Sequence, residues 1–226
     1  MLILQIETAT ASCSVALAKD GCILAVREIN QRNIHAEVIT VFIDELIASA
    51  AISYQDLDAI AVSSGPGSYT GLRIGISTAK GLCFALDKPL IAVETLEAMT
   101  LGVIHARKGG MEKDLLLCPM IDARRMEVFT AIFTPDGRKI RPTTAEIITG
   151  DSFANLLGNN KILFFGDGAE KCREVLSKNA NARFLPGFLN SAVHLTQRAT
   201  EKFNKKEFED VAYFEPYYLK DFIAGR

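Results

Sequence analysis

The sequence predicts an α/β protein of two related lobes, each a mixed five-stranded sheet flanked by helices. Two observations predict this class. Short apolar segments joined by tight turns open the chain, and strand-length apolar segments then alternate with segments of helical periodicity. The same order of elements returns from residue 115 onward. A meander followed by α/β alternation, occurring twice, indicates two lobes of one plan.

Strands are expected in the first lobe where short apolar runs are bounded by turn residues, and Asp20-Gly21 is typical of a hairpin turn. Helices are expected where apolar residues recur every three to four positions. In chain order, the predicted elements are the strands 2–6, 14–18 and 22–29, the helix 35–51, the strand 60–63, the helix 70–86 and the strand 90–93.

The second lobe repeats this order, and Pro135-Asp136-Gly137 marks its second hairpin turn. We place the lobes at residues 1–105 and 106–226, with their junction within 102–110, and we expect the tail from about residue 205 to 226 to dock back on the first lobe. The predicted elements of the second lobe are the strands 116–121, 126–133 and 138–141, the helix 152–157, the strand 162–165, the helix 169–178, the strand 183–185 and the helix 191–203.

The composition indicates a globular chain, because 49% of its 226 residues are hydrophobic. Lys+Arg 25 against Asp+Glu 27 gives a net charge of −2. Such a charge does not attract nucleic acid, so any RNA role requires a local patch or a partner's basic surface. No apolar run approaches the roughly 20 residues of a membrane helix, and no basic segment typical of a signal peptide opens the chain. We therefore expect a cytoplasmic protein.

The sequence predicts no metal site and no catalytic residues. Its five cysteines form no C-x-x-C pair, and they have no zinc-type spacing with the three histidines. His35 is followed four residues later by Ile39, not by a second histidine. No Ser-His-Asp or Cys-His arrangement follows from local spacing.

Residues 63–75 are the most informative segment, because Gly65-Pro66-Gly67 describes a loop held in one shape ahead of a helix. One alternative is that its amides, with Gly67, Tyr69 and Arg73, receive an anion or nucleotide phosphate shared with a partner. The other is that the loop begins a docking helix. The segment lacks the Lys-Ser/Thr ending of a P-loop, and the turn after residue 7 lacks glycine, so phosphoryl transfer is not expected.

The two helices of the first lobe are more apolar than a single buried face requires. Gly71, Gly75 and Ala79 recur every four residues and form a groove of small side chains. Because interior glycine costs about 1 kcal/mol relative to alanine, Gly75 and Gly81 call for close helix packing. This packing is either against another chain or within the lobe itself. The predicted partner interface comprises Val38, Ile39, Phe42, Leu46, Gly71, Leu72, Gly75, Ile76, Ala79 and Leu82.

Mixed charge, including Arg124 and Arg125, occupies the predicted turn between the second lobe's first two strands. Charged hairpin tips are ordinary solvated surfaces, so this turn alone identifies no function. The aromatic segment 214–220 is expected to dock on a lobe rather than to stack on bases.

Duplicated lobes of this order resemble the actin-like (RNase H-like) ATPase superfamily. Four segments, taken together, closely resemble the TsaB (YeaZ) family over the full chain. They are Leu-Gln-Ile-Glu-Thr at 4–8, the glycine-rich run at 65–75, Asp-Ala-Arg at 122–124 and Tyr-Tyr-Leu at 217–219. Glu7 departs from the aspartate that is more usual in this family.

The resemblance implies a non-catalytic accessory protein of tRNA threonylcarbamoyladenosine modification, with no cofactor of its own. It would pair with the catalytic subunit TsaD through the helices 35–51 and 70–86. The ATPase TsaE would join the assembly, ATP or ADP would sit at the subunit junction, and tRNA would be reached only through the complex. Without TsaD the chain would self-associate. The alternatives are an active ATP-dependent transferase or metalloprotease of the same superfamily, and a homodimeric binding protein.

Overall fold

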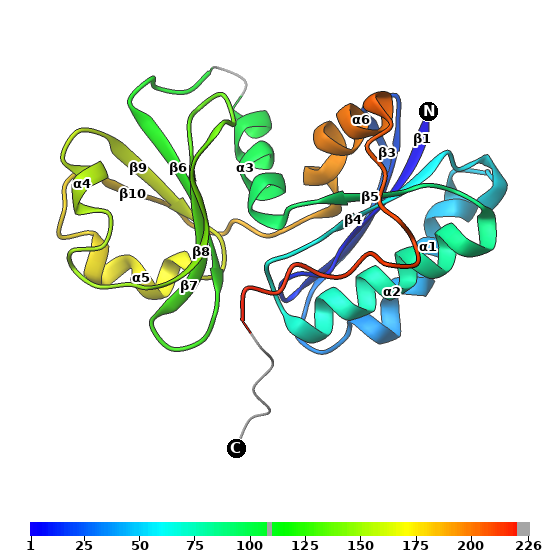
Figure 1. Cartoon of the computed structure of the whole chain (residues 1–226), viewed down its shortest axis with the longest axis horizontal. Helices are drawn as coiled ribbons and strands as arrows, with labels where there is room; N and C mark the ends of the chain where they lie inside the picture. The colour runs from blue at the N-terminus through cyan, green and yellow to red at the C-terminus, as the bar shows by residue number, and fades with distance from the viewer. Residues whose placement is uncertain (108–109, 221–226) are drawn as a thin grey trace. The chain divides into compact units, whose positions relative to one another are not determined.

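The computed structural model describes residues 1–107 and 110–220. The chain divides into two compact units. Unit 1 holds Met1–Ala98 and Asn190–Tyr218, and unit 2 holds Met99–Leu189 together with Leu219 and Lys220. Each unit contains one mixed five-stranded sheet with helices beside it (Figure 1), which confirms the predicted fold class.

The sheet of unit 1 has the strand order β3-β2-β1-β4-β5. The first three strands form an antiparallel meander, and β4 and β5 add parallel to β1 and to each other. The meander follows from the tight turn at Asp20-Gly21, whereas a parallel pair requires a crossover helix. The strands are β1 (Leu2–Glu7), β2 (Ser12–Lys19), β3 (Cys22–Asn30), β4 (Ala59–Ser63) and β5 (Leu90–Val93).

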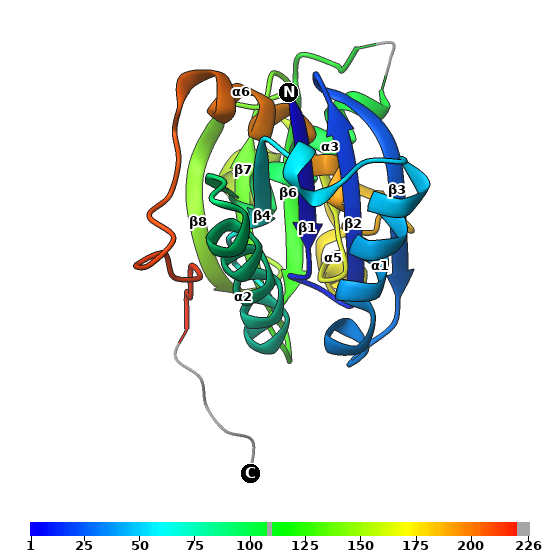
Figure 2. The same ribbon diagram turned by 90° about the vertical axis from the view of Figure 1, so that its right-hand side faces the viewer.

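Helices cover both faces of this sheet. On one face lie α1 (His35–Ser49) and α2 (Tyr69–Leu86), side by side in Figure 2, and the short 3-10 helix η1 (Tyr54–Asp56) follows α1. On the other face lie η2 (Ala192–Leu195) and α6 (Thr196–Lys205). Alternation along β1 separates the two cores, because successive strand side chains point to opposite faces.

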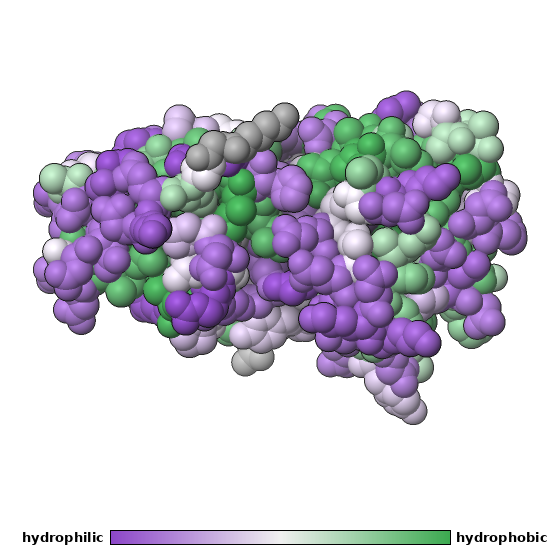
Figure 3. All heavy atoms as spheres, turned by 90° about the horizontal axis from the view of Figure 1, so that it is seen from above, coloured by the Kyte–Doolittle hydropathy of each residue, from purple (hydrophilic) through white to green (hydrophobic). Residues whose placement is uncertain are grey.

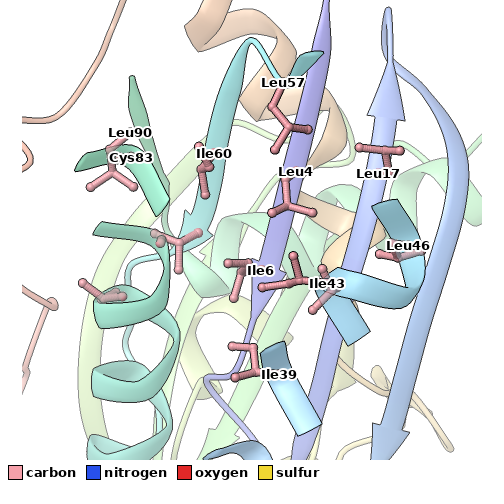
Figure 4. Close-up of a cluster of buried hydrophobic side chains, with 14 of the residues drawn as sticks. Leu4, Ile6, Leu17, Ile39, Ile43, Leu46, Leu57, Ile60, Cys83 and Leu90 are labelled. Carbon is pink, nitrogen blue, oxygen red and sulfur yellow. The ribbon is translucent and has the colours of Figure 1, made fainter. Parts of the chain in front are cut away.

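The larger core of unit 1 lies between the sheet and the first pair of helices. Leu4 and Ile6 of β1 meet Ile39 and Ile43 of α1 there (Figure 4), whereas Ile3 contributes to the core against α6. Each such side chain contributes about 1.5–3 kcal/mol through burial. This core therefore fixes how α1 and α2 are rotated about their axes.

The sheet of unit 2 has the order β10-β9-β6-β7-β8, again an antiparallel meander extended by two parallel strands. The helices α4 (Ala154–Leu157) and α5 (Ala169–Leu176) pack on one face of it. The helix α3 (Thr95–Ala106) begins in unit 1 and continues into unit 2. The strands are β6 (Leu115–Asp122), β7 (Glu127–Phe133), β8 (Lys139–Ile147), β9 (Lys161–Phe165) and β10 (Ala182–Leu185).

The division of the chain differs from the predicted lobes 1–105 and 106–226. Residues 190–218 belong to unit 1, because η2 packs on β1 and β4 and α6 packs on β5. The predicted helix 191–203 is split into these two elements at Thr196. Sequence order had assigned this segment to the neighbouring lobe, whereas the uncovered face of the first sheet determines where it packs.

Two elements of unit 2 also differ from the prediction. The strand β8 runs to Ile147 rather than to residue 141, because Pro142 is tolerated at the edge of a sheet, where no neighbour needs its missing N–H. The helix α3 has no counterpart among the predicted elements, although Leu96, Met99 and Val103 have helical spacing, and only its last residues fall within the predicted junction 102–110.

The segment 206–218, called the strap below, runs along unit 1 after α6. The Glu209 N–H donates to Leu90 O at 2.9 Å beside β5, and the Tyr217 N–H donates to Ser64 O at 2.7 Å. The last part of the predicted docking tail, residues 221–226, lies outside the described residues.

Hydrophilic side chains cover much of the face shown in Figure 3, with hydrophobic side chains reaching it in patches. Within residues 1–107 and 110–220, no helix combines the length and the apolar character that crossing a lipid bilayer demands.

Candidate functional site

The loop between β4 and α2 is anchored on both sides. The Ser64 N–H donates to Val93 O at 2.8 Å, and the Gly65 N–H donates to the Thr95 hydroxyl at 3.1 Å. Further on, the Ser68 N–H donates to Ala9 O at 2.7 Å. The Ser68 hydroxyl caps α2 by accepting from the Gly71 N–H at 3.2 Å. The loop therefore fixes the start of α2 relative to the turn that follows β1.

Glycines are required at the start of α2 because the backbone there lies in close contact with the turn between β1 and β2. A Cβ at Gly67 would overlap Ala9 O, and a Cβ at Gly71 or Gly75 would overlap Thr8 atoms. The four-residue spacing was correctly predicted to call for close packing. Its partner, however, is the β1–β2 turn of the same unit and not the helix of another chain.

Beneath these glycines, the turn carries a buried acid. Glu7 is almost completely buried, and its Oε1 accepts from the Ala9 N–H at 2.6 Å. Burial raises the pKa of Glu7 to about 7, although the hydrogen bond from Ala9 acts in the opposite direction. The Thr8 hydroxyl is buried without a hydrogen-bond partner among the described residues. The start of α2 packs directly against this turn.

Tyr69 and Arg73, two of the predicted anion contacts, hold the strap in this structure. The Tyr69 and Tyr218 rings stack with centroids 4.7 Å apart, and the Arg73 guanidinium lies 4.3 Å from the Tyr69 centroid. Arg73 Nε also donates to the Tyr218 hydroxyl at 3.3 Å. Gly67, the third predicted anion contact, packs directly against Ala9. The anion contact itself stays a prediction.

The strap is tied to α2 at a second point. Lys80 Nζ donates to Phe214 O at 2.9 Å and to Ala212 O at 3.2 Å. At Gly65 a Cβ would lie 2.7 Å from Tyr217 O, so a glycine is required where the strap crosses the loop. The strap thus runs beside α2 from Lys80 to the Gly65-Pro66-Gly67 loop.

The predicted partner interface separates into two groups in the structure. Three of its residues, Val38, Phe42 and Leu82, are partly exposed. The other members are buried inside unit 1, because their stripe of each helix faces the sheet. They are Ile39, Leu46, Leu72, Ile76 and Ala79 in the core, and Gly71 and Gly75 against the β1–β2 turn.

The exposed apolar residues of the two helices include some that the predicted interface leaves out. Phe84 is 87% exposed and Val41 is 50% exposed. Gly81 faces open space, because a Cβ added there would have no atom within 4 Å. Gly81 and Phe84 lie outside the four-residue repeat of Gly71, Gly75 and Ala79, so they lie on another side of α2. This difference in spacing is visible in the sequence. We call Val38, Val41, Phe42, Ile74, Gly81, Leu82 and Phe84 the outer helix face.

The described residues show no group of three or more His, Cys, Asp and Glu side chains placed to hold a metal ion. His35, the histidine at the start of α1, is buried, and its Nε2 lies 2.9 Å from Thr10 O. This contact joins α1 to the turn between β1 and β2.

Comparisons with known proteins agree on one group of relatives. Residues 23–214 match the family model of TsaD, tRNA N6-adenosine threonylcarbamoyltransferase. The chain is 32% identical to the tRNA threonylcarbamoyladenosine biosynthesis protein TsaB of Escherichia coli (strain K12), covering 100% of this chain and 97% of that protein. It is 42% identical to a tRNA N6-adenosine threonylcarbamoyltransferase of Staphylococcus epidermidis over 109 residues, 41% of this chain and 32% of that protein.

Among solved structures, YeaZ from Pseudomonas aeruginosa superposes with a TM-score of 0.77, covering 96% of this chain and 99% of that chain at 24% identity. This likeness supports the fold.

Proposed function

This chain belongs to the TsaB family of tRNA threonylcarbamoyladenosine biosynthesis proteins, and we propose that it serves there as a non-catalytic subunit that binds and activates TsaD. TsaD would transfer the threonylcarbamoyl group to N6 of adenosine 37 in tRNAs that read ANN codons. The match to the TsaD family model and the full-length TsaB relative support TsaD as the partner.

The observation that carries the proposal is the outer helix face. Phe84 is 87% exposed, and burying its side chain against a partner would contribute about 1.5–3 kcal/mol to binding. Gly81 would let the backbone of a partner helix approach closely, since it has open space in front of it. We propose that two helices of TsaD pack on α1 and α2 here.

The remaining partners follow from the same proposal. TsaE would join the assembly, tRNA would be reached through the complex, and a second copy of the chain would occupy the outer helix face when TsaD is absent. For ATP or ADP at the subunit junction, Arg73 is the residue of this chain best able to contact phosphate. Its side chain is exposed and uses Nε for Tyr218, which leaves its other two nitrogens to donate.

Replacing Phe84 by aspartate tests the proposal without disturbing a core. The Phe84→Asp chain is expected to fold normally, to lose TsaD in co-purification and to fail to support tRNA modification in a reconstituted reaction. Ile147→Asp is the matched control, because Ile147 is 68% exposed but lies in unit 2, and it should leave both readouts unchanged. Normal TsaD binding by folded Phe84→Asp would contradict the proposal.

Calorimetry of the isolated chain with ATP and Mg²⁺ separates the proposal from an active ATP-dependent transferase, and metal analysis separates it from a metalloprotease. Tight, stoichiometric binding in either measurement would favour the enzyme. Titration with TsaD addresses the homodimeric alternative, because a homodimer that persists in excess TsaD would show that self-association is the principal state.

A further inference from the structure

The hairpin between β6 and β7 has an unusual pair of residues at its tip. Arg124 has φ 71° and Arg125 has φ 46°, both in the left-handed region. Residues with a Cβ are disfavoured there, and hairpin turns usually place Asn, Asp or Gly at such positions. Two consecutive arginines therefore sit where smaller residues would be more stable.

Neighbouring groups hold the tip in this conformation. The Arg124 N–H donates to Asp122 Oδ1 at 2.9 Å, and the Glu127 N–H donates to Arg124 O at 3.1 Å. The Ala123 N–H donates to Glu127 O at 3.1 Å. A strained backbone conformation persists only where contacts with the surrounding structure hold it in place. Such conformations are concentrated at functional sites.

The acids around the tip already have basic or amide partners. Lys171 forms an ion pair with Asp122, and Lys220 forms one with Glu127. Asp167 Oδ1 accepts from the Asp122 N–H at 3.0 Å. Asp122 and Glu127 therefore pair with lysines, and Asp167 accepts from a backbone amide. Among the described residues, none of the three forms an ion pair with Arg124 or Arg125.

The two arginine side chains point their charge outward. Both residues are exposed, and within residues 1–107 and 110–220 neither side chain makes a hydrogen bond, ion pair or ring contact. A guanidinium donates to phosphate oxygens in a planar, bidentate geometry and is less strongly hydrated than an ammonium group. The tip therefore supplies the local basic patch that a chain of net charge −2 needs in order to touch RNA.

We propose that Arg124 and Arg125 contact the phosphate backbone of the tRNA. The inference rests on the proposed function, which brings tRNA to the complex. RNA is favoured over an acidic protein surface because the role of this family in tRNA modification supplies a polyanion. Lys171 and Lys220 offset the charges of Asp122 and Glu127 beside the tip, so these two acids do not cancel the charge of the arginines.

The test is the affinity for an unmodified tRNA that reads an ANN codon, measured by fluorescence anisotropy over a range of KCl concentrations, with the isolated chain and with the TsaD-bound chain. Loss of two phosphate contacts in Arg124→Gln/Arg125→Gln should lower the salt slope by about two and weaken binding roughly 30-fold at about 0.15 M KCl. Arg32→Gln/Arg107→Gln removes two exposed arginines elsewhere and should change little. An unchanged affinity in the tip variant would overturn the proposal.

Two further measurements separate the possible outcomes. Arg124→Asn/Arg125→Gly should raise the thermal midpoint while weakening RNA binding, because it relieves the strain and removes the charge; weaker binding caused by misfolding would instead lower the midpoint.

Co-purification with TsaD should be unaffected by either tip variant. Loss of TsaD with unchanged RNA affinity would assign the arginines to a protein contact and refute the RNA role. If the wild-type chain binds RNA through the tip but never binds TsaD, the proposed function fails and this inference stands.

Discussion

Alanine substitutions at two glycines of α2 should have opposite effects on stability. Gly75 and Gly81 are both interior helix residues, and alanine is favoured over glycine in a helix by about 1 kcal/mol. At Gly81 nothing opposes this gain, because a Cβ meets no atom within 4 Å. At Gly75 the same Cβ overlaps the buried Thr8 side chain, and overpacking of this kind costs about 1–3 kcal/mol.

The expected result is a gain of about 1 kcal/mol for Gly81→Ala and a net loss of about 1 kcal/mol for Gly75→Ala. In a chain of this size that corresponds to shifts in the thermal midpoint of roughly 3 °C upward and downward. Because the chain has no tryptophan, unfolding is best followed by far-UV circular dichroism. A Gly75→Ala chain as stable as Gly81→Ala would refute the packing of α2 on the β1–β2 turn.

Three more predictions concern a buried acid, the strap and the cysteines. Burial raises the pKa of Glu7 from 4.5 to about 7, so the folded state retains a proton that the unfolded state releases. The free energy of unfolding should then fall by roughly 3 kcal/mol as pH rises through this range, and Glu7→Gln should flatten the profile; parallel profiles would contradict this. Tyr218→Ala removes the stack on Tyr69, so proteases should cut the strap faster, with little change in the midpoint; unchanged cleavage would show that the stack does not hold it. In thiol labelling of the native chain, the exposed Cys22 should react first, and equal rates at all cysteines would contradict the burial of the other four.

The sequence predicted the fold class and most elements because these depend on local patterns. Alternation and helical spacing are written in consecutive residues, so β1, α2 and β9 were found close to their observed positions. The placement of η2 and α6 was missed, because it depends on contacts with strands more than 90 residues away. No local pattern specifies which sheet a late helix covers.

The predicted interface shows the same limit at the level of single residues. Helical periodicity identified small and apolar stripes on α1 and α2, but both helices are apolar on more than one side. Which stripe faces the sheet is decided by the core around Leu4 and Ile6 and by the contact of Gly75 with Thr8. The stripe left at the surface carries Phe84, which the prediction did not include.

By itself, the sequence determined the two-lobe α/β plan, the extent of the helices α1 and α2 and the family, because each depends on residue order and on motifs such as Gly65-Pro66-Gly67. Only the tertiary structure decided which helix residues reach the surface, where the strap lies, and that Arg124 and Arg125 are held with positive φ and unpaired side chains within the described chain. These properties arise from contacts between distant segments, and no pattern in neighbouring residues encodes them.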